Sequence, residues 1–477
     1  MRARSPLLAF LVGIAPVFFL MWRPSAEPRH RERVLNVDAG PIDWIALVGG
    51  VEPASTQVSL AQDLELAHRV LGPKGVRLFG GGAGAFVQVS ASGDATLRQR
   101  LGRFFDPRER DVRYVPGPDA NGPASFQAFL DVLDVAYGTQ GPLWLYLGGH
   151  GEGGEEPADA LLRLWGGDAL GVDDLAQILD SSPRPVRLVH TACFGGGFAD
   201  VLFRQGDPDA GPSDRDRCGV FATSWDEEAS GCDPDPDRAR QEGYALHFFR
   251  ALGGLDRHGR PVQVDLDQNG EVSMLEAHTR ARIASRSLDV PTTTSERWLA
   301  WTIEMQDVEL DGEPVELIEE EAVIAELGRD LGLSDEESAQ RAFAELQLEM
   351  EEHEERTGEL ELRADDAYYR LRIRLLERWP ILDDPWHEDH ARVLAEEAEA
   401  IERWLEHSDE AVVFAEAQRR LNQAMERHDD LRVQLSLRRR VVEAWDTLAF
   451  AASVRAHDPE AWTVFERLRR CERSALR

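Results

Sequence analysis

Lysine and cysteine are scarce in this sequence, and basic charge is outnumbered. Lys74 is the only lysine, and 53 Lys and Arg residues stand against 87 Asp and Glu residues, which gives a formal net charge of −34. Binding of a phosphate backbone requires a basic face, so this charge argues against nucleic acid as a partner. The four cysteines include no Cys-x-x-Cys pair, which argues against a zinc site built from thiolates.

The N-terminus has the pattern of an export signal. Met1–Arg4 is basic, and 7–22 is an apolar segment of signal-peptide length that is marginally long enough to span a membrane. The site for cleavage is poor, because Pro24 lies two residues before Ala26, so cleavage and retention as an inner-membrane tether both stay open. We expect an exported protein of the periplasm or cell envelope, with a signal peptide or membrane anchor over 1–22 and a linker over 23–40.

Apolar strand-like segments alternate with amphipathic helices over residues 41–308. The strand Trp44–Gly49 precedes one such helix, and the helix Phe126–Tyr137 precedes another strand. This alternation predicts an α/β fold with an open, mostly parallel sheet and helices on both faces. Farther on, long helical runs with many tryptophans predict an α-helical C-terminal domain over 334–477, after a linker over 309–333. This domain would pack either on the α/β domain or on a protein partner.

Two of the strand-like segments end at reactive side chains. The run Leu143–Gly149 ends at His150, and the run Val186–His190 leads to Cys193, with glycines beside both residues. Ligands bind outside the carboxyl ends of strands in open α/β sheets, so the imidazole and the thiol would share one cleft. An imidazole raises the thiolate fraction of a cysteine and protonates a leaving amine. The alternative is a buried structural cysteine and an unrelated core histidine.

A strand ending in His-Gly and, about forty residues later, a strand ending in Ala-Cys-x-Gly resembles the caspase–legumain–gingipain group of cysteine peptidases. The resemblance covers roughly Ile42 to Arg282 and implies a caspase-like sheet. It also implies His150 as general acid and base, Cys193 as nucleophile, and the amides of Gly151 and Cys193 as an oxyanion hole, with no cofactor required for the chemistry. The glycine run after Cys193 departs from the more usual Cys-x-Gly or Cys-x-Ser-Gly pattern.

The same resemblance implies a pocket for the residue that precedes the scissile bond. This pocket would lie beside the end of the Cys193 strand and the loop that follows the strand over 220–224. The acids at 226–228 would suit an arginine or lysine of the substrate by charge pairing. The competing interpretation is that they are solvated loop acids. The predicted pocket residues are Thr191, Ser224, Trp225 and Asp226.

Residues 265–276 match the twelve-residue calcium loop. Oxygen-bearing side chains occupy positions 1, 3, 5 and 9, Gly270 permits the sharp turn at position 6, and a glutamate stands at position 12. The preceding segment does not look helical, so we expect an isolated loop that binds a structural Ca²⁺. The alternative is an acidic turn that caps a helix. The predicted ligands are Asp265, Asp267, Asn269, Glu271, Ser273 and Glu276.

The other cysteines bear on the compartment. Cys218 and Cys232 flank the segment 219–231 and would form a disulfide in an oxidising environment. Cys471 is then left over, and we expect it to be a free surface thiol.

These features lead to three functional hypotheses. The first is an exported cysteine endopeptidase, with its peptidase domain over 41–308, that cleaves peptides or proteins through an acyl-thioester. The second is a catalytically silent caspase-like module that binds a protein partner through its helical region. The third is a transpeptidase that hands the acyl group to an amine.

Overall fold

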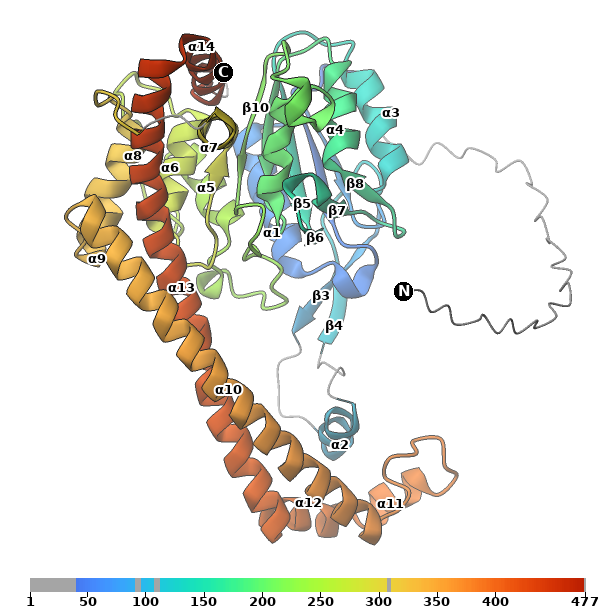
Figure 1. Cartoon of the computed structure of the whole chain (residues 1–477). Coiled ribbons are helices and arrows are strands. Elements are labelled where there is room, and N and C mark those ends of the chain that lie inside the picture. The colour runs from blue at the N-terminus through green and yellow to red at the C-terminus, as the bar shows by residue number, and fades with distance from the viewer. Residues whose placement is uncertain (1–39, 91–95, 107–111, 307–309, 476–477) are drawn as a thin grey trace, which may run out of the picture. The chain divides into compact units, whose positions relative to one another are not determined.

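The computed structural model describes residues 40–90, 96–106, 112–306 and 310–475 (Figure 1). The expected signal peptide or membrane anchor (1–22) and nearly all of the expected linker (23–40) lie outside the described residues. Within the described ranges, no helix combines the length and the hydropathy that a membrane span requires.

A six-stranded sheet lies at the centre of the α/β region, with the strand order β11-β10-β9-β5-β1-β2. Neighbouring strands are parallel, except for the antiparallel pair β10 and β11. The sheet confirms the predicted mostly parallel α/β architecture. Its strands are β1 (Trp44–Gly49), β2 (Gly75–Phe79), β5 (Leu143–Gly149), β9 (Val186–His190), β10 (Arg217–Phe221) and β11 (Thr292–Thr293).

Side chains of the central strands alternate between two buried clusters. On β1, Trp44, Ala46 and Val48 belong to one cluster, whereas Ile45 and Leu47 belong to the other. Because both faces of the strand are apolar, both must be covered by helices. The first face is covered by α1 (Val58–Leu71), α5 (Tyr244–Leu252) and α6 (Met274–Ala284), and the second by α3 (Phe126–Ala136) and α4 (Val172–Asp180).

The order of the strands reverses between β1 and β5. From β2 at one edge, the chain passes through two strands outside the main sheet and returns to β5 on the other side of β1. The carboxyl ends of β1 and β5 therefore form the topological switch point, where doubly wound sheets bind ligands. The smaller sheets pair β3 (Phe86–Ser90) with β4 (Val112–Pro116), and β7 (Leu161–Arg163) with both β6 (Gly151–Glu152) and β8 (Ala169–Gly171).

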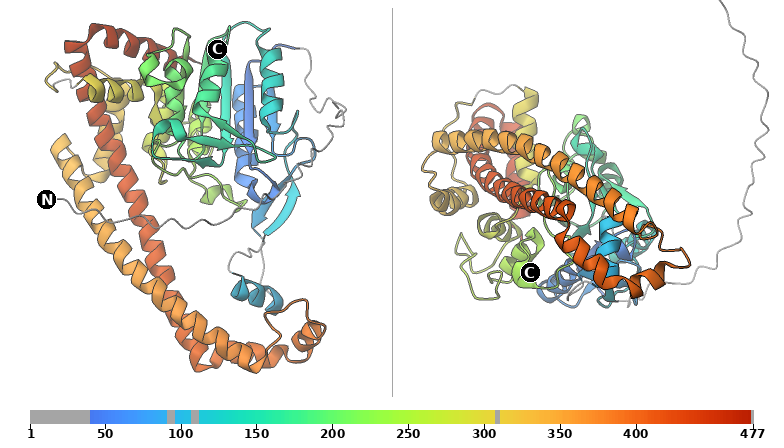
Figure 2. Two further views of the ribbon diagram at one scale, coloured as in Figure 1. Left: turned by 45° about the vertical axis from the view of Figure 1, so that its right-hand side comes forward. Right: turned by 90° about the horizontal axis from the view of Figure 1, so that it is seen from below.

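Long helices follow the α/β region and confirm the predicted helical C-terminal region (Figure 2). The helices of this region are α10 (Glu336–Arg378), α11 (His390–Glu396), α12 (Ala398–His407), α13 (Asp409–His457) and α14 (Pro459–Glu472). The two longest, α10 and α13, pack against each other as a hairpin. Leu101 of α2 (Leu97–Phe105), which lies between β3 and β4 in the sequence, is buried together with Leu375 of α10 and Ile401 of α12.

The segment expected to be a linker, 309–333, is largely helical in its described part. It contains α8 (Ile318–Val323), the π-helical turn η7 (Ile324–Gly328) and α9 (Arg329–Leu331). Val323 and Leu327 are buried together with Ile283 of α6 and Val441 of α13. The linker prediction is wrong here, because these apolar side chains join helices that are distant in the sequence.

A disulfide joins Cys218 on β10 to Cys471 on α14. The predicted bond between Cys218 and Cys232 and the predicted free surface thiol at Cys471 are therefore both wrong. Cys471 is buried in the same cluster as Cys218, because α14 returns to the sheet, where α7 (Thr294–Gln306) packs against it through Trp298 and Phe465. The bonded residues are 253 positions apart, so proximity along the chain selected the wrong partner.

Candidate active site

His150 and Cys193 follow neighbouring parallel strands. β5 and β9 pair in a register that places Leu147 opposite His190. Each candidate residue therefore lies three positions beyond a paired residue, at the same edge of the sheet. In this register the apolar side chains of each strand alternate between the two buried clusters on either face of the sheet.

The two strand ends meet through their main chains. A Cβ atom on Gly151 would lie 1.9 Å from the carbonyl oxygen of Cys193 and 3.2 Å from its amide nitrogen, so only glycine permits this approach. The same turn also approaches β1, since a Cβ atom on Gly149 would lie 2.2 Å from the carbonyl oxygen of Gly49. The structure thus brings the segments of His150 and Cys193 together at the switch point.

The loop after β1 determines the orientation of the His150 imidazole. Its Nε2 lies 2.8 Å from the carbonyl oxygen of Ser55 and 3.1 Å from Oε1 of Gln57. Because a carbonyl oxygen can only accept, Nε2 carries the proton and donates it, and Nδ1 keeps its lone pair. The ring is held in the tautomer that can accept a proton at Nδ1.

The Cys193 thiol is half-buried against the loop that follows β10. The amide of Ala229 donates a hydrogen bond to Sγ at 3.3 Å, and no hydrogen bond joins Cys193 to His150, although both are among the described residues. Burial raises the pKa of the Cys193 thiol, and the carboxylates of Glu228 and Asp289 raise it further, against the lowering effect of the Ala229 amide. The resting thiol is therefore protonated at neutral pH.

The residue after Cys193 has a left-handed backbone. Phe194 has φ 57° and ψ 15°, a conformation that is uncommon for a bulky residue, and its amide donates to the carbonyl of Glu227 at 2.8 Å. Such residues persist only where their surroundings hold them, and they concentrate at functional sites. The chain continues into a 3₁₀ helix, where a Cβ atom on Gly196 would lie 2.6 Å from the carbonyl carbon of Ser224. This approach accounts for a glycine in the unusual run after Cys193.

The amides predicted to form an oxyanion hole lie outside the main-chain hydrogen bonds of the sheets. The main-chain amide of Arg163 donates to the carbonyl of His150 at 2.9 Å. The next pair of residues along the two antiparallel strands, Gly151 with Leu162, is therefore of the non-hydrogen-bonded kind. The Gly151 amide therefore points away from β7. The Cys193 amide donates to no main-chain carbonyl of the described residues.

The predicted pocket residues lie at the ends of β9 and β10. The Thr191 hydroxyl donates to the carbonyl of Leu147 at 3.4 Å, next to the end of β5. The Ser224 hydroxyl donates to Asp226 at 2.7 Å, and Trp225 between them is half-buried. Ser224 and Asp226 are thus hydrogen-bonded to each other, whereas Thr191 lies beside β5, the strand that leads to His150.

The acids of the predicted pocket are bound by the helical region. Arg439 on α13 lies 3.3 Å from Asp226 and 2.9 Å from Glu227, and Arg432 on the same helix lies 3.1 Å from Glu228. Burial raises the pKa of Glu227, and Arg439 partly offsets this effect. The sequence suggested either solvated loop acids or a pocket that accepts a basic residue of the substrate. Neither interpretation predicted that arginines of α13 bind these acids.

The calcium-type loop gathers three of its predicted ligands. Carboxylate oxygens of Asp265, Asp267 and Glu276 all lie within 4.8 Å of one another, and an all-oxygen set of this kind suits Ca²⁺. Asn269 donates from its side chain to Asp267 at 2.9 Å, while Glu271 is exposed. The helix-capping alternative is also present, because Glu276 forms a capping box at the start of α6. Its partner there is Ser273.

A second free thiol lies near the candidate nucleophile. The Cys232 Sγ atom lies 3.7 Å from the carbonyl oxygen of Gly149. Burial, with a contribution from neighbouring Cys193, raises the pKa of the Cys232 thiol to about 12. This thiol is therefore protonated and poorly reactive at neutral pH.

Sequence reasoning missed the residues that position the candidate pair. Ser55 and Gln57 orient His150, Ala229 donates to Cys193, and Arg439 binds the adjoining acids. The first three act from loops, partly through main-chain atoms, which no residue-type pattern reveals. The run of three arginines at 438–440 was the one available signal for Arg439.

The resemblance to caspase–legumain–gingipain peptidases thus depends on the site residues and the sheet that carries them. No protein-family model matches this chain, and no curated protein matches it.

Proposed function

We propose that this protein is an exported cysteine endopeptidase of the caspase–legumain–gingipain type, with Cys193 as nucleophile and His150 as general acid and base. The observation that supports this most is the main-chain contact between Gly151 and Cys193 at adjacent strand ends. This contact brings the main chains that carry the two residues together, and the amides of Gly151 and Cys193 lie outside the hydrogen bonding of the sheets.

The thiol is protonated before substrate binds, so its proton must move during the attack. In the proposed reaction, Sγ of Cys193 forms a bond to the scissile carbonyl carbon while the thiol proton passes to Nδ1 of His150. The carbonyl oxygen becomes negative and accepts hydrogen bonds from the amides of Gly151 and Cys193. The carbon–nitrogen bond then breaks, and Nδ1 gives its proton to the leaving amine. Water that loses a proton to Nδ1 hydrolyses the thioester and restores the thiol.

The acids at the proposed pocket bear on substrate preference. Because Arg439 and Arg432 already bind Asp226, Glu227 and Glu228, the loop offers little uncompensated negative charge. We therefore expect no strong preference for arginine or lysine before the scissile bond.

A peptide-library cleavage assay tests the proposal. Cys193→Ala and His150→Ala should each lower kcat/KM by about 10³-fold or more. Cys232→Ala is the matched control, because this thiol lies at the same site but is buried and protonated, and it should retain cleavage. Cleavage that survives in Cys193→Ala would rule out this mechanism.

A catalytically silent caspase-like module is a second candidate. It is favoured by the raised pKa of Cys193, which burial causes, and by the lack of a hydrogen bond between this thiol and His150. In this case the helical hairpin would bind a protein partner. A peptidyl electrophile separates the candidates: a peptidase is labelled at Cys193 and loses labelling in His150→Ala, whereas a silent module is not labelled.

The disulfide bears on the proposed compartment, and the calcium-type loop bears on the proposed metal. Export fits the disulfide between Cys218 and Cys471, because disulfides persist in oxidising compartments.

We also propose that residues 265–276 bind Ca²⁺ in that compartment, with Glu276 as the bidentate ligand. Added Ca²⁺ should raise the unfolding temperature, and Glu276→Gln should abolish the increase. An unchanged unfolding temperature at millimolar Ca²⁺ would contradict the calcium site.

A further inference from the structure

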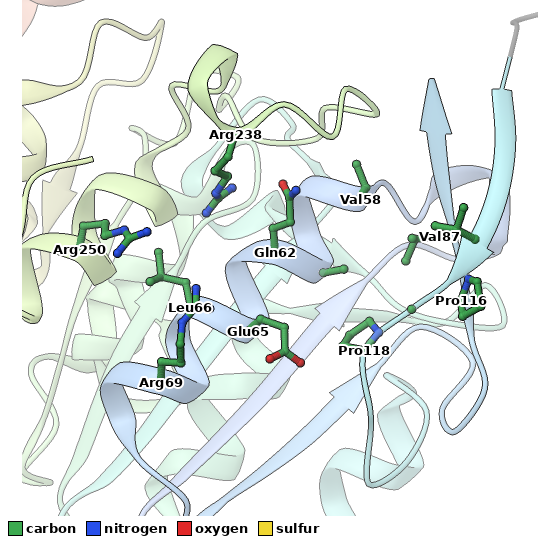
Figure 3. Close-up of a pocket in the computed structure, with 13 residues that line it drawn as sticks. Val58, Gln62, Glu65, Leu66, Arg69, Val87, Pro116, Pro118, Arg238 and Arg250 are labelled. Atoms are coloured by element: carbon green, nitrogen blue, oxygen red, sulfur yellow. The ribbon is translucent and has the colours of Figure 1, made fainter. Parts of the chain in front are cut away.

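A hollow of about 510 Å³ lies on the outer face of α1, and neither His150 nor Cys193 lines it. α1 forms its floor, the β3–β4 pair forms one wall, and α5 with the loop before it forms the other (Figure 3). Its volume falls within the range of small-ligand sites. Residues on α1 at helical spacing face the hollow, among them Val58, Gln62, Leu66 and Arg69.

The two sides of this hollow differ in chemistry. Figure 3 shows Arg238 in the loop before α5 and Arg250 on α5, with Leu66 and Arg69 of α1 on the side of Arg250. The opposite side is formed by apolar residues of β3 and of β4 and its following loop, which are Val87, Val115, Pro116 and Pro118. Glu65 of α1 also lines the hollow, where its carboxylate lies 3.5 Å from Arg77. The hollow is therefore charged toward α5, with three arginines and one paired acid, and apolar toward β3 and β4.

Two of the three arginines have no partner among the described residues. Arg238 is bound to Asp63 and Gln241, whereas Arg69 and Arg250 make neither an ion pair nor a hydrogen bond. The Nε atom of Arg250 is also buried without a partner. A buried, unpaired donor of this kind is costly and calls for a ligand.

The charges around Arg250 point in the same direction. Burial lowers the pKa of Arg250, and the neighbouring cations Arg69 and Arg238 lower it further. The acid that acts on it, Asp256, is already bound to Arg260 at 2.7 Å. In a chain of net charge −34, the pair Arg69 and Arg250, which forms no ion pair with the described residues, favours an anion.

A second hollow, of about 1290 Å³, continues from the same arginines. It shares Leu66, Arg69 and Arg250 with the first, and its walls include the aromatic side chains of Trp144 and Phe249. The arginine pair thus lies where two partly apolar hollows meet, which leaves room for a tail on either side of a bound head group.

We infer that this site binds an anionic amphiphile, a carboxylate with an apolar tail, whose head group pairs with Arg69 and Arg250. The carboxylate accepts hydrogen bonds from the two guanidinium groups. The tail covers the apolar wall of β3 and β4. This inference does not rest on the proposed peptidase activity, because neither Cys193 nor His150 lines the hollow.

Calorimetric titration of the full chain with octanoate, acetate and octan-1-ol tests this inference. Octanoate should bind saturably, and acetate and octan-1-ol should each bind at least about tenfold more weakly, because each lacks one half of the ligand. Arg69→Gln combined with Arg250→Gln should weaken octanoate binding by about tenfold or more and leave octan-1-ol unchanged. Arg98→Gln, an exposed arginine on α2, is the control and should change nothing.

Three results would overturn the inference: octan-1-ol binding as tightly as octanoate, acetate binding as tightly as octanoate, or the double variant keeping its affinity. Circular dichroism establishes that the double variant is folded. If it is not, the exposed Arg69→Gln variant alone should weaken octanoate binding severalfold, and unchanged affinity in that variant would equally overturn the site.

Discussion

Both the outer, N-terminal half of α13 (409–433) and its inner, C-terminal half (434–457) are rich in arginine. The arginines of the two halves differ in their burial and in their partners. In the inner half, Arg440 is fully buried and donates to main-chain carbonyls at 2.8 to 3.0 Å. Those carbonyls belong to the segment after α6 and its last turn, and they are those of Arg282, Ser285, Ser287 and Asp289.

The outer half is held at its surface by exposed ion pairs. Arg420 binds Glu416 at 2.7 Å within the helix, and Arg427 binds Glu349 of α10 at 2.8 Å. Such pairs contribute little to stability, because water screens them. The comparison teaches that the same residue type is part of the core in one half of a helix and a solvated charge in the other, according to what the helix packs against.

Replacement of Arg440 should give the largest effect. Arg440→Met leaves several buried carbonyls without a donor, so we expect a loss of about 3–5 kcal/mol in the free energy of unfolding. Urea unfolding followed by circular dichroism measures this loss, and Arg440→Lys should recover only part of it. A loss below about 1 kcal/mol would remove the distinction between the two halves.

The disulfide should contribute the next largest effect. Cys218→Ser combined with Cys471→Ser should lower the free energy of unfolding by about 2–5 kcal/mol, because the bond closes a very long loop. Cys232→Ala is the control, since this cysteine is free. An unchanged urea midpoint in the double variant would mean that α14 is held to the sheet by packing alone.

Two buried acids, Glu443 in the inner half of α13 and Glu472 at the end of α14, should also make stability depend on pH. Burial raises the pKa values of Glu443 and Glu472 to about 7, from an ordinary value of 4.5. The folded state therefore binds these protons more tightly, and their stabilising effect is complete below pH 4.5 and lost as the pH rises through 7. Burial lowers the pKa values of His190, His247 and His278 to about 3, 4 and 3, so these groups oppose the acids as the pH falls below 6.5. The effect of the acids is therefore measured as the difference in unfolding temperature between the unchanged protein and Glu472→Gln.

Neighbouring buried acids should not mask this difference. Despite burial, nearby basic groups lower the pKa values of Glu296 and Glu319, so both stay ionised from about pH 5.5 to about pH 8. As the pH is lowered from about 8 to about 5.5, the unfolding temperature of the unchanged protein should rise relative to that of Glu472→Gln, and a constant difference between the two would contradict the raised pKa of Glu472.

A smaller effect is expected on substrate preference. Arg439→Gln removes the partner of Asp226 and Glu227, so peptides with arginine before the scissile bond should improve severalfold in kcat/KM relative to alanine peptides. Arg438→Gln is the matched control, because Arg438 binds Gln434 on its own helix. An unchanged ratio of the two kcat/KM values would show that these acids do not contact the substrate residue before the scissile bond.

The outer half should give the smallest effect. Arg420→Gln breaks an exposed pair on the helical hairpin, and we expect no measurable change in the urea midpoint. A clear loss of stability would show that the exposed pairs act as a network and would weaken the contrast with Arg440.

Local patterns were enough to predict the sheet and the placement of the candidate pair. The apolar run Leu143–Gly149 and the similar run Val186–His190 are strands, and their parallel pairing brings His150 and Cys193 to one edge. These features depend on burial and on the register of neighbouring strands, which the residue types along each strand largely determine.

The residues that complete the site depend on contacts between distant parts of the chain. Arg439 meets Asp226 across 213 positions, and Cys471 meets Cys218 across 253. The Ser55 carbonyl acts through the main chain, so its identity as serine carries no signal. Sequence patterns describe one element at a time, whereas these pairs exist only once α13 and α14 have returned to the α/β region.

The bond between Cys218 and Cys471 has a practical consequence for any nicked form of the protein. A cut at any peptide bond between these two cysteines leaves both pieces covalently attached, so the nicked chain keeps its full mass until a reductant is added. A cut in the segment 207–216 before β10 precedes the bond, and its two pieces separate on a denaturing gel with or without reductant. Paired reducing and non-reducing electrophoresis therefore tells on which side of Cys218 the chain was cut.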